Sequence, residues 1–384
     1  MLSDIQIKEI QKIRQTLHKY PELSGSESET ASFVKGYLDR FDADEIISGI
    51  GGEGLMGIFN GESPGKGPTI LIRAELDALA IHEASSLSYA SENSGVMHAC
   101  GHDGHMAMVL GVAKWLKNNR PKYGRIILLF QPAEETGLGA GAMLSDEKFN
   151  SIPVDRAIAL HNLPGYKKNS VFIKEGTFAS ASVGLKIEFI GQSSHAAYPG
   201  EGINPALALS EFVQKLEAVK KKAQLHEKFR VLTVTYIKLG EPAFGINPGH
   251  CEMGVTVRAE TDNGIIEMIE DVKNELSAVD EAFEGNVSTE EREPFSAVVN
   301  DAKGVKLLSS IADRLGVDIQ FLSEPFAWSE DFGEFRAKCP ITLFGLGSGE
   351  DFPALHSENY DFDDDLISVG TTIFCEYIKE LNNG

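Results

Sequence analysis

The stretch "GRIILLFQPAEE", residues 124–135, decides the fold class of this 384-residue chain. Its first half is a continuous run of large aliphatic and aromatic side chains, which is typical of a strand buried on both faces. Two adjacent glutamates, Glu134 and Glu135, follow the run directly. A buried strand followed at once by charged residues indicates a parallel sheet with a polar site at the carboxyl ends of its strands.

Other buried strands and amphipathic helices lie on both sides of this stretch. Three further apolar runs predict strands: "GPTILIRAELDAL" (67–79), "DRAIALHN" (155–162) and "CPITLFGLG" (339–347). Helical spacing of apolar residues predicts helices over 5–19, 27–41, 104–119 and 363–381. Asp103 is placed to cap the third of these helices. The alternation predicts an α/β domain with a mostly parallel sheet covered by helices.

The pattern changes between residues 179 and 291. A half-exposed strand over 182–191 is followed by a helix, two strands, a helix and a strand, with the last strand at 286–295. The order βαββαβ is that of the ferredoxin-like plan. We therefore expect an inserted α+β domain of residues 179–291, and a first domain built from residues 1–178 and 292–384.

Composition and charge exclude some classes of protein. Acidic residues outnumber basic ones 57 to 35, for a formal charge of -22, which disfavours binding to nucleic acid or to anionic membranes. The first residues lack the pattern of a signal peptide, and no apolar run reaches the length of a membrane span. The four cysteines (Cys100, Cys251, Cys339, Cys375) are far apart, without a CxxC pair. These features predict a cytoplasmic protein.

Six chemically reactive residues fall at the ends of the predicted strands, just before a helix or in the loop that follows a strand. They are Cys100, His102, Glu134, Glu135, His161 and His356. Ligands of open α/β sheets bind outside the carboxyl ends of the strands, so these side chains are expected to meet there. A thiolate, imidazoles and carboxylates together suit a borderline-soft divalent ion such as zinc, manganese or cobalt.

The residues alone leave three interpretations open. In the first, two metal ions about 3.5–4 Å apart share these ligands, and a neighbouring glutamate acts as general base. In the second, Cys100 is a nucleophile activated by His102 or His161. In the third, a structural metal site stabilises a non-catalytic, dimeric binding protein; structural sites usually have four closely spaced ligands, a spacing that this sequence lacks.

Several motifs occur in the order found in one protein family. They include "LHKYPELSGSESET" (17–30), "HACGHDGHMAMVLGVAKWL" (98–116), "QPAEETGLGAGAML" (131–144), "ALHNLP" (159–164), "SSHAAYPGEGINP" (193–205) and "LHSENYDF" (355–362). The chain resembles the aminoacylase/carboxypeptidase family of metallopeptidases over nearly its whole length. The branch that it resembles contains hippurate hydrolases, auxin-conjugate amidohydrolases and N-acetyl-amino-acid deacetylases.

The resemblance implies a role for individual residues. Matching positions make five residues the ligands of two divalent ions per subunit (manganese, zinc, cobalt or nickel): Cys100, His102, Glu135, His161 and His356. Glu134 becomes the general base. The inserted domain becomes a lid that forms a homodimer, and its His195 stabilises the oxyanion from the partner subunit.

Three further residues receive roles from the resemblance. Asn247 and Arg258 of the lid hold the substrate carboxylate, and Asp77 orients a metal ligand from behind it. The sequence departs from the usual pattern of the branch, Asp-Met-Asp-Ala-Leu-Pro, by having Glu75 and Ala80 at its first and last positions. The resemblance predicts a metal-dependent amidohydrolase that splits N-acyl amino acids into an acid and an amino acid. A dipeptidase or carboxypeptidase on the same site is the alternative.

Overall fold

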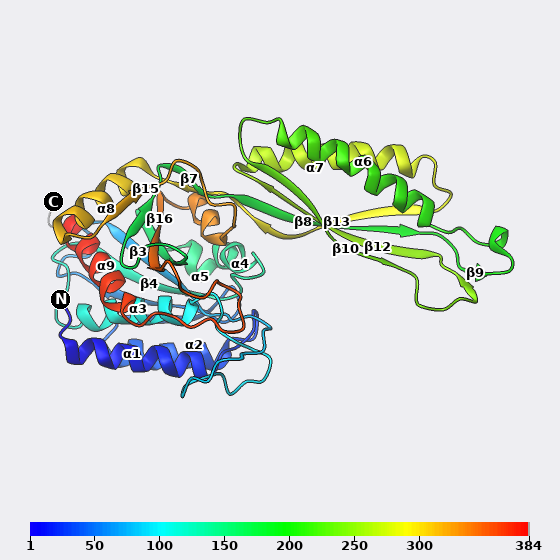
Figure 1. The fold of residues 1–384 in the computed structure, drawn as a ribbon. Helices are drawn as coiled ribbons and strands as arrows, with labels where there is room; N and C mark the ends of the chain where they lie inside the picture. Colours follow the sequence, from blue (N-terminus) through cyan, green and yellow to red (C-terminus); the bar gives the residue numbers. More distant parts are fainter. Residues whose placement is uncertain (383–384) are drawn as a thin grey trace. The chain divides into compact units, whose positions relative to one another are not determined.

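The computed structural model describes residues 1–382, which divide into two compact units. The first unit comprises residues 1–178, 298–324 and 331 onward, and the second comprises residues 179–297 and 325–330. The second unit is therefore an insertion in the first, as the colours along the chain in Figure 1 show.

An eight-stranded sheet forms the centre of the first unit, in the order β1-β2-β4-β3-β5-β16-β6-β15. Its strands are β1 (Glu45–Ile50), β2 (Gly54–Asn60), β3 (Thr69–Glu75), β4 (Arg125–Gln131), β5 (Arg156–Pro164), β6 (Val171–Ile173), β15 (Ile319–Phe321) and β16 (Ile341–Gly349). The central strands β4, β3, β5 and β16 run parallel to one another. The predicted, mostly parallel sheet is thus confirmed, but β1 and β2 add an antiparallel edge that the sequence analysis missed.

Helices cover both faces of this sheet. They are α1 (Asp4–Lys19), α2 (Ser28–Arg40), α3 (His102–Leu116), α4 (Gly139–Ser145), α5 (Glu147–Asn150), α8 (Ala302–Leu315) and α9 (Leu366–Asn382), with a 3₁₀-helix, η2 (Asp331–Ala337). Residues of α1, α2, α3, α8 and α9 share one hydrophobic core with the sheet, while α4 contacts β4 and η2 contacts β16. In the part of the chain that the structure describes, no helix is both long and apolar enough to cross a membrane.

The central strands are buried on both faces. In β4, the alternate residues Ile126, Leu128 and Phe130 belong to the core shared with α3, and the intervening Ile127 and Leu129 are equally buried. Each large apolar side chain that is fully buried contributes about 1.5–3 kcal/mol. The strands are therefore held rigidly, and this fixes the positions of the residues that directly follow them.

The second unit is a four-stranded antiparallel sheet with two helices, α6 (Ala206–Gln224) and α7 (Asp262–Asp280). The sheet order is β10-β12-β8-β13, with β8 (Ala181–Ile190), β10 (Arg230–Leu239), β12 (His250–Ala259) and β13 (Asn286–Phe295). Figure 1 shows both helices on the same face of this sheet. Its βαββαβ order agrees with the predicted ferredoxin-like plan. The predicted end of the domain, residue 291, falls inside β13.

Four short strands and a 3₁₀-turn complete the description. In the second unit, β9 (Ser194–His195) pairs with β11 (Ile246–Asn247), and η1 (Pro199–Glu201) follows β9. The pair β7 (Gly176–Ala179) and β14 (Val298–Asn300) lies where the chain passes between the units.

Candidate metal centre

The first unit brings all six candidate residues of the catalytic domain together. Cys100 and His102 lie at the start of α3, the two glutamates follow β4, His161 lies in β5 and His356 lies in the loop after β16. Three groups of side chains each have their ligand atoms within 4.8 Å of one another: Cys100, His102 and His161; Cys100, Glu135 and His356; and His102, Glu134 and Glu135. Because Cys100, His102 and Glu135 each belong to two groups, the groups form one continuous cluster.

The two buried histidines point the same ring nitrogen into this cluster. His102 Nδ1 donates to the carbonyl oxygen of Asp77 at 2.9 Å, and His161 Nδ1 donates to that of Asn162 at 2.8 Å. A carbonyl oxygen only accepts, so the proton of each neutral ring is on Nδ1 and the lone pair is on Nε2. His102 Nε2 is buried and, among the described residues, has no hydrogen-bond partner. A divalent metal ion would satisfy this nitrogen.

The charges around His102 favour a cation beside it. Burial opposes a charge on the ring, but the hydrogen bond with Asp77 and the charges of Glu75, Asp77 and Glu135 raise the pKa of His102 to about 10. Glu134 Oε2 and Glu135 Oε1 lie 3.8 and 4.0 Å from His102 Nε2. A metal ion can supply this positive charge in place of the proton.

His356 closes the cluster from a more open position. Its Nε2 lies 3.8 Å from Glu135 Oε2, and its side chain is 53% exposed. The backbone of His356 is left-handed, with φ of 62°, a conformation that few non-glycine residues adopt. A hydrogen bond from His356 N to Ala99 O, at 2.8 Å, attaches this loop to the segment that carries Cys100.

Asp77 connects two of the candidate ligands. It lies 3.4 Å from His102 Nδ1 through Oδ1, and its Oδ2 accepts from the backbone N–H of Glu135 at 3.0 Å. Ser24 also donates to Oδ2, at 2.7 Å. The side chain is fully buried, and its contacts are compatible with the predicted role of orienting a metal ligand, which stays a prediction.

Glu75, which stands where the branch usually has aspartate, is buried next to His102 of the cluster. Its buried carboxylate pairs with Arg73 and accepts from His105 Nδ1 at 2.8 Å. His105 Nε2 in turn contacts Asn162 Oδ1 at 2.8 Å, and Asn162 Nδ2 donates to Tyr360 OH at 2.7 Å. This buried chain, which the sequence analysis did not find, links β3, α3, β5 and the loop after His356.

The predicted cap of α3 was wrong. The helix begins at His102, and its N-cap is Gly101 in the left-handed conformation. Asp103 instead accepts from His18 Nδ1 at 2.9 Å and lies 3.5 Å from Arg14. Both partners are on α1, so the carboxylate joins two helices where a local cap was expected.

The other candidate residues belong to the second unit. His195 is exposed and pairs with Ile246 through the β9–β11 ladder. Asn247 is buried: its Nδ2 donates to Ser194 Oγ at 3.0 Å, and its Oδ1 accepts from Asn204 at 2.6 Å. The amide of Asn247 is thus used to hold the segment that carries His195.

Arg258 lies at the opposite end of β12. It is paired in register with Ser182, near the start of β8, whereas His250 at the other end of β12 is paired with Ile190. At about 3.3 Å per residue, Arg258 is roughly 25 Å from His250, at the end of β12 that follows Asn247 in the chain. The structure therefore does not bring Asn247 and Arg258 of one chain together.

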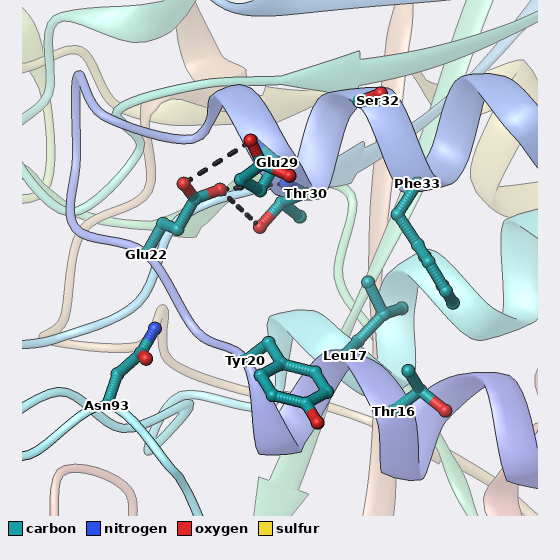
Figure 2. Close-up of a pocket in the computed structure, with 9 residues that line it drawn as sticks. All are labelled: Thr16, Leu17, Tyr20, Glu22, Glu29, Thr30, Ser32, Phe33 and Asn93. Atoms are coloured by element: carbon teal, nitrogen blue, oxygen red, sulfur yellow. Dashed lines mark hydrogen bonds between the residues drawn. The ribbon is translucent and has the colours of Figure 1, made fainter.

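A cavity of about 450 Å³ also lies in the first unit, between α1, α2 and the loop at Asn93 (Figure 2). Tyr20, Phe33 and Leu17 give it apolar walls. The carboxylate of Glu22 on its rim accepts from Thr30 N at 2.7 Å and Thr30 Oγ1 at 2.8 Å, as the dashed lines in Figure 2 show. None of its lining residues is a candidate ligand.

Comparison with known families defines the class of protein. The chain belongs to Peptidase family M20/M25/M40, whose model matches residues 71–380. The expected hydrolase of amide bonds and the family resemblance read from the motifs are confirmed.

The chain is similar to several named proteins along nearly its whole length. The chain is 32% identical over 380 residues to the N-acetyl-L-cysteine deacetylase of Bacillus subtilis, covering 97% of this chain and 88% of that protein. It is 30% identical over 374 residues to the hippurate hydrolase of Campylobacter jejuni, covering 96% and 95%. The crystal structure of the Bacillus subtilis YXEP protein, described as a dinuclear metal-binding peptidase, matches with a TM-score of 0.80, 26% identity and 99% coverage of both chains.

Proposed function

We propose that this protein is a metal-dependent amidohydrolase that cleaves N-acyl amino acids into a carboxylic acid and a free amino acid. The deacetylase and the hippurate hydrolase to which it is similar both act on amides of this kind by name. The observation that carries the proposal is the continuous cluster of a thiol, three imidazoles and two carboxylates. Within it, His102 Nε2 is buried and makes no hydrogen bond to any residue that the structure describes.

Five side chains of the cluster would hold two divalent ions. They are Cys100, His102, Glu135, His161 and His356. The donor set mixes sulfur, nitrogen and oxygen, which suits zinc, manganese or cobalt. When bound, such ions supply Lewis acidity at the scissile carbonyl and lower the pKa of nearby water towards ~7.

Glu134 is the one residue of the six that we do not assign as a metal ligand, and we assign it to proton transfer. Its carboxylate is buried, lies beside His102 and is next in sequence to a proposed ligand. In this position it takes a proton from the attacking water and delivers it to the departing amine, as a general base and then a general acid do. His195 donates a hydrogen bond to the developing oxyanion.

His195 and Arg258 support a site built from two chains. They lie at opposite ends of the second unit's sheet. A small substrate bound beside one of them is therefore too far from the other residue of the same chain to contact both. We infer that the second unit is a lid, that Arg258 serves its own chain's site and that His195 serves the partner's. Asn247 then acts through the His195 segment, because its amide is hydrogen-bonded there.

An exposed strand offers a surface for this dimer. β10 is at the edge of its sheet and exposes Val231, Tyr236, Ile237 and Leu239. An edge strand has unpaired backbone groups that a second copy can pair with, in a symmetric contact. The four cysteines are buried, and none of them forms a disulfide within the part of the chain that the structure describes. This supports a reducing compartment, and we propose the cytoplasm.

The experiment is hydrolysis of a panel of N-acetyl amino acids, N-benzoyl amino acids and dipeptides, before and after chelation. Chelation should abolish amide hydrolysis, and manganese, zinc or cobalt should restore it. Preference for dipeptides would favour the peptidase alternative. Full activity in protein shown to be free of metal would contradict the proposal.

A further inference from the structure

The turn after β4 contains an unusual backbone conformation. Ala133 has φ of 52°, in the left-handed region, although it is not a glycine. It immediately precedes Glu134 and Glu135. For an L-residue this conformation is roughly 5- to 30-fold less populated than right-handed ones. Something in the fold must therefore hold Ala133 there.

The carbonyl oxygen of Ala133 is held from within the turn. It accepts from Gly139 N at 3.1 Å and from Thr136 Oγ1 at 3.1 Å. Glu134 O likewise accepts from Gly137 N at 2.8 Å. These contacts define the turn, but none of them involves the N–H of Ala133, which is hydrogen-bonded to a residue outside the turn.

That partner is Glu27, which is distant in sequence. Glu27 Oε1 accepts from Ala133 N at 2.8 Å and from Gly25 N at 2.9 Å. The side chain of Glu27 is fully buried, and its Oε2 makes no hydrogen bond among the described residues. The carboxylate is thus placed to hold the peptide group before Ala133, and it reaches none of the six cluster residues through a described hydrogen bond.

We propose that Glu27 is a positioning residue that aims Glu134 by holding Ala133 in its left-handed conformation, an inference that rests on the proposed role of Glu134 as the base. Rotation about φ of Ala133 displaces every atom that follows it. Glu135 is restrained separately, because its own N–H donates to Asp77. Loss of Glu27 therefore disturbs Glu134 more than the proposed ligand beside it.

The test combines Glu27→Ala with Ala133→Gly. Glu27→Ala should lower kcat on the order of 10- to 100-fold, the size of effect that small misplacements cause. KM and the apparent Kd for Mn²⁺ should change less than about threefold. Glycine adopts the left-handed region without steric cost, so the double variant Glu27→Ala/Ala133→Gly should regain roughly 5-fold or more in kcat.

Two variants control for a purely structural role. Glu27→Gln retains the accepting oxygen and should stay within about threefold of the parent, since the oxygen that it replaces, Oε2, makes no hydrogen bond in the described part of the chain. Glu22→Ala removes a carboxylate in the same segment that caps α2 (Figure 2); it should lower stability but not kcat. If Glu27→Ala does not fold, Glu27→Asp, which is one methylene shorter, takes its place.

Amide hydrogen exchange separates this inference from the proposed function. Peptides covering Gly137 and Gly139 should lose protection in Glu27→Ala and regain it in the double variant, whether or not any substrate is hydrolysed. If the parent protein hydrolyses nothing in the panel, the proposed function fails and the exchange result still decides the role of Glu27. No recovery in the double variant, or an equal loss of kcat in Glu22→Ala, would overturn the inference.

Discussion

Glu134 and Glu135 are adjacent in sequence but differ in their surroundings. The N–H of Glu135 donates to Asp77, and its carboxylate faces His356. The carboxylate of Glu134 accepts from Asp331 N at 3.4 Å and lies beside His102. Replacing each by glutamine should therefore have a different effect.

We expect Glu134→Gln to retain its metal while kcat falls by about 10²–10⁴, the usual contribution of a general base. Glu135→Gln should instead lower metal occupancy, because an amide is a poorer ligand than a carboxylate. Metal content per chain and kcat at saturating metal check both statements. Full occupancy in both variants, with Glu135→Gln the slower, would mean that the two roles are exchanged.

The sequence could indicate the candidate ligands because each stands at the end of a strand, at the start of a helix or in the loop beyond a strand. It could not indicate Glu27, Ser24 or Tyr360. Their partners Ala133, Asp77 and Asn162 are between 53 and 198 residues away. Such contacts leave no local pattern, and an acidic residue before a helix is ordinarily a solvated one.

At the scale of elements, charged side chains attach α1 to α3, through Asp103, and to the loops at Glu83 and at residues 361–364. His18 contacts Asp103 at 2.9 Å and Glu83 at 3.4 Å, and Arg14 pairs with Asp361 and Asp364 at 2.7 Å. Burial opposes a charge on His18, but its hydrogen bonds to Asp103 and Glu83 raise its pKa to about 9. Helix α1 is therefore held most strongly when His18 is protonated.

This pKa shift makes the stability of the first unit depend on pH. The raised pKa stabilises the folded state fully below the ordinary value of about 6.5, and this stabilisation is lost as the pH rises through about 9. A shift of this size corresponds to about 3 kcal/mol. Wild type should exceed His18→Gln by that order in the free energy of unfolding near pH 6, and the difference should shrink towards pH 10.

Urea unfolding of both proteins at the two pH values measures this difference. His226→Gln, at an exposed histidine of the second unit, provides the control and should leave the pH dependence unaltered. A difference between wild type and His18→Gln that is constant across this range would show that His18 contributes by packing alone.

The elements themselves were predicted unevenly. The strands β3, β4, β5 and β16 could be found because burial on both faces leaves continuous apolar runs. β1 and β2 were missed because glycines interrupt the segment "EIISGIGGEGLMGIFN" (45–60), and such a composition is more typical of a loop. Two of these, Gly51 and Gly52, form the hairpin turn with φ of 61° and 112°, a conformation that glycine adopts readily.

At the scale of the whole molecule, the proposed dimer can be tested by mixing inactive variants. Glu134→Ala and His195→Ala should each be nearly inactive as homodimers. If each site takes its base from one chain and His195 from the other, subunit exchange gives about half heterodimers at equal amounts. Every heterodimer then has one complete site, so activity should recover to about a quarter of wild type.

Subunit exchange must be confirmed independently, for example with two affinity tags. Mixing Glu134→Ala with the double variant Glu134→Ala/His195→Ala is the control, because no combination of these chains has a complete site. Confirmed exchange without recovery would place His195 in its own chain's site or outside catalysis.

The insertion of one unit into the other has a consequence for synthesis on the ribosome. Residues 179–297 are continuous, so the inserted unit can fold as soon as it emerges, apart from its short segment 325–330. The first unit cannot complete its sheet until later, because β5 has no neighbouring strand on one side until β16 has been synthesised. During that interval β5 is an open edge with apolar side chains, the kind of surface that chaperones cover. His356 arrives later still, so a chain that terminates before it carries a complete sheet in its inserted unit and an incomplete set of candidate ligands.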